Sequence, residues 1–352
     1  MLYIIIAILM FGILIALHEF GHFITAKLLG VRVNEFAIGM GPLLFSTQKG
    51  ETQYSLRAIP MGGFCAMEGE DDASDDPRAF SNKPAWRKFI ILVAGSFMNF
   101  LTGFVLLALL LAQNTFFVVP VIDTLMEGFP YENAQGLLPG DRIVRVNGER
   151  IYTKSDLDLF FGRDEDGIMD LVIERDGVRL ERPGFDLRPR EYTYEGKTVQ
   201  MRGLICVREP FRVGNWLRQS WYNTIDMVRM VRLSLVDLFS GRAGIQDMSG
   251  PIGIVTMMSD VGAQSPNMAA ALANILWFVA FIAINLAVMN LLPIPALDGG
   301  RIFFLAVNGL FSLLTRRKLD PKYEGYVNMA GFCCLILLMV VVAFNDIVKL
   351  FA

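Results

Sequence analysis

The chain has 352 residues, of which 53% are hydrophobic and only 19% carry a charge. This apolar excess is typical of a membrane protein and argues against a wholly water-soluble one. The formal net charge of −3 offers no basic excess, so no nucleic-acid partner is expected.

The first apolar stretch covers residues 2–29 and is long enough to cross a bilayer, which takes roughly 20 apolar residues. It contains the only two histidines of the chain, His18 and His22, with Glu19 between them. On a helix, residues four apart share a face, so both imidazoles can bind one zinc ion while the glutamate activates a water molecule. The stretch therefore predicts a zinc hydrolase site inside a membrane helix.

Two other interpretations of this stretch carry less weight. Incidental polar residues, or a noncatalytic metal site, would place costly ionisable groups in an apolar span without a catalytic role. A cleaved signal peptide has a basic region before its apolar core and a small-residue cleavage site, and the stretch lacks both.

A β-hairpin is predicted between the first two spans. Residues 42–47 and 52–59 are strand-like runs that flank the polar segment 48–51, and residues 61–63 resemble a flexible end. An exposed strand edge can bind an extended peptide by main-chain pairing. The alternative is an ordinary cytosolic hairpin. The second span follows at residues 89–111.

Residues 115–208 have the composition of a soluble domain. The segment from Gly136 to Gly148 resembles the core of a PDZ domain, with a tight turn, an alternating strand and a second turn. Residues 171–174 and 178–180 predict a hairpin. Such a domain binds a peptide terminus by strand addition, or it acts only as a spacer that excludes bulky outer domains.

An amphipathic helix is predicted over residues 216–239. Its apolar residues follow helical spacing, with arginines interleaved. This pattern favours a helix in the outer membrane interface. Packing against the PDZ-like domain is the alternative, and the residues themselves do not decide.

The third and fourth spans are predicted at residues 268–292 and 325–344. Pro293 and Pro295 would end the third helix, and Asp298 follows directly. Non-helical backbone at membrane depth is tolerated only where it is buried in protein or lines a cavity. Asp298 is therefore a candidate for the active site, and a helix cap or an interfacial charge is the alternative.

Basic side chains set the expected orientation. They gather before the second and fourth spans, at Lys83, Arg87, Lys88, Arg316, Arg317, Lys318 and Lys322. By the positive-inside rule, residues 30–88 and 305–322 face the cytosol and both termini face outward. His18 then lies about 25 Å along its helix, at a rise of about 1.5 Å per residue, in the cytosolic third of the bilayer.

A third zinc ligand is needed, and cysteine does not supply it. The four cysteines are scattered without CxxC spacing and are expected to be unpaired, buried thiols: Cys65, Cys206, Cys333 and Cys334. A carboxylate must complete the site. Because the third span runs in the same direction as the first, its end brings Asp298 to the depth of His22.

Four motifs in order along the whole chain resemble those of a known family: His18-Glu19-Phe20-Gly21-His22 and residues 94–99, 249–253 and 290–300. With them the chain resembles the site-2 protease family of membrane-embedded zinc metalloproteases, of the RseP/RasP type. Two features depart from the family pattern. Ser96 stands where many members have proline, and there is room for a single PDZ domain.

The resemblance implies a polytopic α-helical membrane protein with four transmembrane helices, an inserted extracytosolic PDZ domain of β-rich α+β type, and a membrane-associated β-hairpin that dips toward the active site. Residues 1–114 would form the first half of the membrane domain, 115–208 the PDZ domain, and 209–352 the interfacial helix and the second half. The expected location is the bacterial cell membrane, with the active site near the cytosolic side.

The resemblance also implies a function. His18, His22 and Asp298 would bind zinc, and Glu19 would act as general base. The protein would cut peptide bonds within the transmembrane segments of single-pass membrane proteins, such as anti-sigma factors or remnant signal peptides.

The roles expected for three asparagines differ. The resemblance implies that Asn285 and Asn290 hold the unwound backbone of the substrate, although asparagines buried in a bundle more often join helices by hydrogen bonds. Asn99 is expected to be a packing residue. Peptide termini are expected at the PDZ groove if the domain recognises substrates.

Two hypotheses from other classes remain. The first is a PDZ-bearing membrane scaffold or chaperone with structural zinc, but structural zinc takes four protein ligands and only three are evident. The second is a metal transporter, which would normally show further intramembrane carboxylates or an internal repeat of spans.

Overall fold

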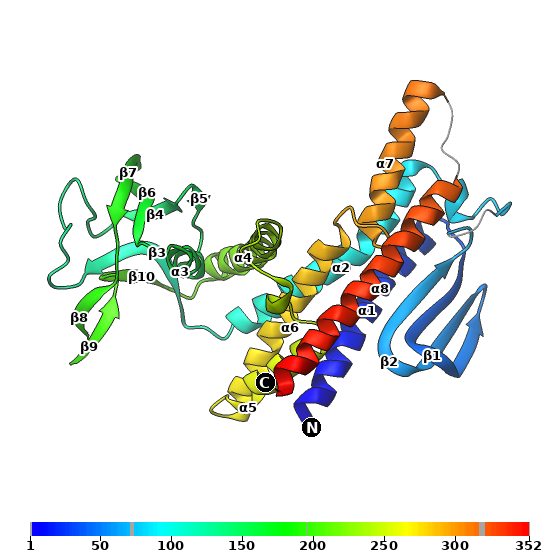
Figure 1. The fold of residues 1–352 in the computed structure, drawn as a ribbon, viewed down its shortest axis with the longest axis horizontal. Coiled ribbons are helices and arrows are strands. Elements are labelled where there is room, and N and C mark those ends of the chain that lie inside the picture. Colours follow the sequence, from blue (N-terminus) through cyan, green and yellow to red (C-terminus); the bar gives the residue numbers. More distant parts are fainter. Residues whose placement is uncertain (1, 71–73, 195, 317–320, 352) are drawn as a thin grey trace. The chain divides into compact units, whose positions relative to one another are not determined.

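The computed structural model describes residues 2–70, 74–194, 196–316 and 321–351, so Arg317 and Lys318 lie outside the described residues. The chain divides into two compact units, residues 1–106 with 227–352, and residues 107–226. Within the described residues, four helices are long and apolar enough to cross a membrane: α1 (Leu2–Leu28), α2 (Ala85–Leu111), α6 (Met268–Asn290) and α8 (Pro321–Phe351). All four predicted spans are confirmed (Figure 1).

Helices α1 and α2 pack closely because glycine stands at their contact. A Cβ atom added at Gly21 would collide with the carbonyl oxygen of Ala94 and lie 2.8 Å from Cγ of Met98. Membrane helices commonly approach through such small residues. The contact brings the histidine-bearing face of α1 against α2.

The predicted hairpin is present as β1 (Val33–Lys49) and β2 (Thr52–Met67). Its outer part pairs as predicted, for example Thr47 with Tyr54. Both strands bend, so Phe36 of β1 pairs with Tyr54 on one side and Cys65 on the other. The expectation of a flexible end is wrong at Gly63, which pairs with Ile38.

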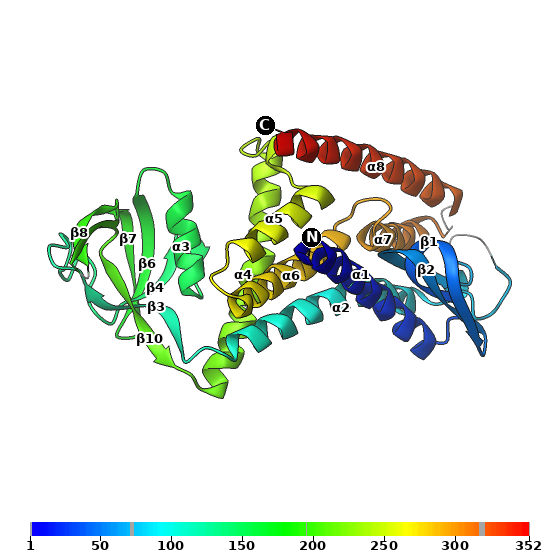
Figure 2. The same cartoon turned by 90° about the horizontal axis from the view of Figure 1, so that it is seen from below.

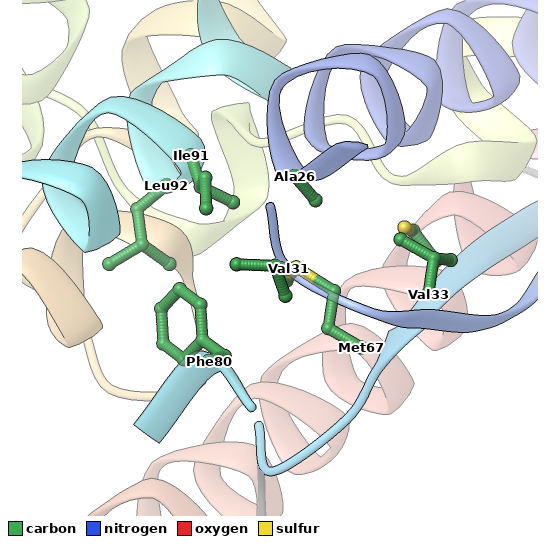
Figure 3. Packing of buried hydrophobic residues seen from close by; sticks show 8 residues of the cluster. Ala26, Val31, Val33, Met67, Phe80, Ile91 and Leu92 are labelled. Atoms are coloured by element: carbon green, nitrogen blue, oxygen red, sulfur yellow. The ribbon is translucent and has the colours of Figure 1, made fainter. Parts of the chain in front are cut away.

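One hydrophobic core fixes this sheet to the helices. Its members come from α1, the connection after it, the inner ends of β1 and β2, the 3-10 helix η1 (Phe80–Asn82) and α2. Figure 3 shows the packing of Ala26, Val31, Val33, Met67, Phe80, Ile91 and Leu92. Cys65 is a further buried member. The inner ends of both strands are therefore anchored beside the two helices.

A second core joins α1 and α6 through α5 (Pro251–Ala263), a helix that the apolar spans do not predict. Leu14, Met258 and Ile282 are among its buried members. Figure 2 shows α5 between these two helices and the C-terminal end of α8. The chain reaches α5 through the 3-10 helix η2 (Ile245–Asp247) and continues from α6 into α7 (Asp298–Thr315).

Helix α8 is attached at few points. Near its C-terminal end, buried Asp346 accepts hydrogen bonds from the backbone N–H groups of Gly250 (3.0 Å) and Gly253 (2.8 Å) at the start of α5. Among the α8 residues whose exposure is described, only Val342 and Asp346 are buried. Most of its apolar surface is thus open to lipid.

The four cysteines differ in exposure. Cys65 and Cys206 are buried as predicted, whereas Cys333 and Cys334 are exposed. The expectation of buried thiols is therefore wrong for the last two. They lie on the outward apolar surface of α8, where a small apolar side chain needs no protein partner.

The unit of residues 107–226 is built on an antiparallel sheet in the order β10-β3-β4-β6-β7, with β5 paired to β4. Its strands are β3 (Phe116–Leu125), β4 (Arg142–Val146), β5 (Glu149–Arg150), β6 (Ile168–Arg175), β7 (Val178–Asp186) and β10 (Leu204–Pro210). A separate hairpin consists of β8 (Arg190–Tyr194) and β9 (Lys197–Met201). Helix α3 (Lys154–Arg163) packs against β3 and β4.

Two local sets of hydrogen bonds stabilise this unit. Asp141 is fully buried, and both of its oxygens accept hydrogen bonds of 2.7 Å from Arg175. The paired charge fixes the turn before β4 to the end of β6, where the predicted hairpin with β7 begins. Thr153 and Asp156 form a capping box that starts α3.

Helix α4 (Val213–Phe239) confirms the predicted amphipathic helix. Its first half packs within the same unit as the sheet. Tyr222 stacks on Tyr152 with ring centroids 4.8 Å apart, and the Thr153 hydroxyl donates a 2.6 Å hydrogen bond to Asp226. This half therefore follows the packing alternative rather than lying free in the membrane interface.

The contact at Gly21 can be tested by adding a methyl group. We expect Gly21→Ala to lower the free energy of unfolding by about 1–3 kcal/mol, because α1 and α2 must move apart. Thermal unfolding of the purified protein in detergent measures the change. In the control Gly309→Ala on α7, nothing lies within 4 Å of the new Cβ, so stability should hold or rise. Equal midpoints for both variants would contradict the tight contact.

Candidate active site

His18 and His22 lie on one face of α1, and both are buried. As predicted, the helix of the third span ends before the prolines, since α6 ends at Asn290 and α7 begins at Asp298. Gly299 and Gly300 let the first turn of α7 lie directly on the intervening loop. A Cβ at either glycine would collide with a loop carbonyl oxygen. This packing sets the position of Asp298.

Three side-chain atoms converge at this point. Oδ2 of Asp298 lies 3.2 Å from Nε2 of His18 and 3.4 Å from Nε2 of His22, and the two Nε2 atoms are 3.2 Å apart. Tetrahedral zinc with ligands at about 2.0–2.1 Å would separate its ligand atoms by about 3.3 Å. Oδ2 is buried, and within the described residues it has no hydrogen bond of normal geometry. The donor set and its spacing therefore fit a zinc ion.

The backbone of α2 determines the tautomer of His22. Nδ1 of His22 lies 2.8 Å from the carbonyl oxygen of Ile91. A carbonyl oxygen can only accept, so Nδ1 carries the proton and Nε2 keeps its lone pair. Ligating histidines commonly have such an outer acceptor, which also fixes the ring orientation.

Gly95 makes room for both imidazoles. A Cβ atom at this position would collide with Nε2 of His22 and lie 2.7 Å from Cε1 of His18. No residue other than glycine fits at this point of α2 without moving a ring. The close approach of the two helices is therefore also a requirement of the site.

Glu19 lies beside the converging atoms and is half-buried. The backbone N–H of Cys65 lies near its carboxylate, and its Cγ would be 3.7 Å from a Cβ at Gly63. Residues 63–67 of β2 therefore run past the glutamate. Burial raises the pKa of the Cys65 thiol above its usual range, so the thiol stays protonated there.

The structure places the three asparagines differently from one another. Nδ2 of Asn99, which is 1% exposed, lies 3.4 Å from Nδ1 of His18. The expectation of a plain packing residue missed this contact, which depends on the face that α2 turns toward α1. The signal available in the sequence was that Asn99 lies four residues after Gly95, which places both residues on one face of α2. Asn285 and Asn290 are half-buried on α6, and their role stays a prediction.

The space at Gly95 can be tested directly. We expect Gly95→Ala to weaken zinc binding, because the new methyl group must displace His22 or His18. Zinc per chain, measured by elemental analysis after dialysis, should fall well below that of the unmodified protein. Gly103→Ala is the matched control on the same helix, α2. Its Cβ would lie 2.5 Å from the side chain of Ile284 on α6, away from the histidines. Stoichiometric zinc in Gly95→Ala would refute the steric argument.

Comparison with known proteins agrees with this geometry. Residues 6–338 match the profile of Peptidase family M50. A relative from Clostridium acetobutylicum that bears the name of a zinc metalloprotease is 36% identical over 348 residues, 98% of this chain and 97% of the relative. The regulator of sigma-W protease RasP of Bacillus subtilis is 28% identical over 427 aligned positions, 98% of each chain.

These similarities extend over nearly the whole chain and confirm the resemblance to site-2 proteases. The four apolar helices agree with a protein that crosses the membrane several times. The chain belongs to peptidase family M50 and is a multi-pass membrane zinc metalloprotease.

Proposed function

We propose that this metalloprotease hydrolyses peptide bonds within the transmembrane segments of single-pass membrane proteins. The observation that carries the proposal is the position of His18, Glu19 and His22 on α1, a helix with the length and composition of a membrane span. A hydrolytic site on such a helix is reached most directly by a substrate that is itself in the bilayer. Ionisable groups in a span usually mark a function of this kind.

Each residue of the site has a proposed role. His18, His22 and Asp298 hold the zinc ion, which when bound supplies an activated water molecule and polarises the scissile carbonyl group. Glu19 accepts the proton of the water and later delivers it to the leaving nitrogen. The nearby backbone N–H of Cys65 is proposed to orient the carboxylate for both transfers.

The substrate must be extended before it is cut, because the carbonyl groups of a helix are engaged in its own hydrogen bonds. Residues 63–67 pair with β1 on one side only among the described residues, and they pass Glu19. This free edge is suited to bind the unwound segment by main-chain pairing. Asn285 and Asn290 are proposed to bind its remaining backbone groups.

The bent middle of the hairpin is proposed to enter the membrane, whereas its turn is joined to the end of α1 by the ion pair of Glu51 with Lys27. The bent part exposes large apolar side chains, among them Leu43, Leu44, Phe45, Leu56 and Ile59. Such side chains would favour aggregation in water, whereas lipid accommodates them. The proposed topology follows the basic loops: residues 30–88 and 305–322 belong to the cytosolic side, from which the hairpin dips into the membrane, and the active site lies near that side.

Residues 115–208 are proposed to form an extracytosolic PDZ domain, between membrane halves 1–114 and 209–352. A cavity of about 530 Å³ lies between the start of β3 and the start of α3, closed on one side by Gln219 and Asn223 of α4. Such a cavity between a strand and a helix supports recognition of a peptide terminus. Size exclusion of bulky outer domains remains the alternative role.

The substrate class is proposed from the relatives. The name of the Bacillus subtilis relative connects that protein with regulation of sigma-W. Anti-sigma factors and remnant signal peptides, both single-pass, are therefore the first substrates to test. Membership of a protease family speaks against the scaffold and transporter hypotheses.

The role of Glu19 can be tested by removing its charge. We expect Glu19→Gln to lower the cleavage rate by about 10²–10⁴-fold, because proton transfer is lost. Zinc content should remain unchanged, since the ligands are intact. The assay uses purified enzyme in detergent with a panel of single-pass segments, with and without a zinc chelator. Glu127→Gln, at an exposed position of the other unit, is the control. Normal turnover by Glu19→Gln would assign the general base elsewhere.

The third ligand can be tested separately. We expect Asp298→Asn to lower zinc content and cleavage together, because a neutral amide is a much poorer ligand than a carboxylate. Elemental analysis of the dialysed variant measures the first effect and the segment assay the second. If the variant kept one zinc ion per chain, Asp298 would not be a ligand.

A further inference from the structure

The two histidines of the site need acceptors on their far ring nitrogens. When Nε2 binds a metal ion, the proton of the neutral imidazole sits on Nδ1, which must then donate a hydrogen bond. His22 donates to the carbonyl oxygen of Ile91 at 2.8 Å. Nδ1 of His18 faces the side-chain amide of Asn99 at 3.4 Å. The structure therefore singles out Asn99 as the candidate acceptor for His18.

The spacing along α2 supports this role. Ile91, Gly95 and Asn99 are four residues apart and share one face of the helix. Ile91 lies opposite His22 and Asn99 opposite His18, with Gly95 between them, where a Cβ would strike both rings. One face of α2 thus presents three features to the two histidines: the carbonyl oxygen of Ile91, the space at Gly95 and the amide of Asn99.

The orientation of the Asn99 amide decides its chemistry. As the atoms stand, Nδ2 faces Nδ1 of His18, while Oδ1 is buried without a hydrogen-bond partner. An amide nitrogen only donates, so this orientation suits a His18 whose proton is on Nε2. That tautomer cannot use Nε2 as a metal ligand. Turning the amide by half a rotation exchanges two nearly isosteric groups and brings Oδ1 to face Nδ1.

We propose that, with zinc bound, Oδ1 of Asn99 accepts a hydrogen bond from Nδ1–H of His18, so that Asn99 is a positioning residue for this zinc ligand. The inference rests on the proposed ligand set. It explains how His18 and His22 are held with their ring planes 82° apart, since each ring is fixed from a different turn of α2. Burial strengthens the effect, because Asn99 is only 1% exposed and solvent has little access to replace a lost acceptor there.

Substitution of Asn99 can distinguish a role as hydrogen-bond acceptor from a role as donor. Asn99→Asp keeps the shape and offers only acceptor oxygens, whereas Asn99→Leu keeps approximate size and offers none. Removal of an outer acceptor from a ligating histidine typically weakens metal binding about 10–100-fold. We therefore expect that loss in Asn99→Leu and near-normal zinc affinity in Asn99→Asp. If the amide instead donated to His18, both variants would lose affinity.

The measurement is the zinc dissociation constant of full-length protein in detergent, by competition with a chelator of known affinity. Ser96→Ala is the matched control on α2, because its hydroxyl is buried without a partner and its loss removes no contact to a ligand. Visible absorption of the cobalt-substituted protein reports the ligand geometry. It should change in Asn99→Leu and not in Ser96→Ala. Thermal unfolding of the metal-free proteins checks that each variant folds.

The outcomes distinguish this inference from the proposed function. Wild-type protein that binds no zinc, or Asp298→Asn that binds it normally, would overturn the ligand set itself. Suppose that the wild type and Asp298→Asn behave as expected. If Asn99→Leu then binds zinc as tightly as the wild type, only the role of Asn99 is overturned. Equal losses of zinc affinity in Asn99→Leu and Asn99→Asp would also overturn the role of Asn99, because the acceptor oxygens of the aspartate would then fail to restore zinc binding.

Discussion

The close approach of α1 and α2 is the constraint on which the site depends. Gly21 and Gly95 place no side chain of their own between the helices, so the imidazole rings reach the backbone and the amide of α2. At membrane depth, water does not satisfy polar groups that the protein leaves unpaired. A change in this helix contact would therefore alter both the packing of α1 against α2 and the surroundings of the two proposed zinc ligands.

The sequence predicted what depends on local or compositional signals. The four spans, the histidine spacing and the helix break at Pro293 and Pro295 all follow from a few neighbouring residues. By contrast, α5 is shorter than a span and its burial depends on Leu14 and Ile282, which lie far away in the chain. The contact of Asn99 with His18 is missed for the same reason. The face of a helix that meets another helix is set by tertiary packing.

The hairpin shows the same limit within a single element. Its outer pairing follows from alternating residues around a polar turn, whereas the second pairing of Phe36 with Cys65 requires β2 to bend back along the inner half of β1. That bend carries the N–H of Cys65 to Glu19. The part of the sheet that reaches Glu19, the proposed general base, is thus the part that neighbouring residues do not reveal.

Asp346 has a consequence for the order in which the protein assembles. The residue lies 96 positions after Gly250, yet it provides the hydrogen-bond acceptor for the first N–H groups of α5. During synthesis, α1, α5 and α6 are all made before this carboxylate exists. The start of α5 therefore lacks this acceptor until α8 has been made, and a later span completes a helix that packs against the one bearing the histidines.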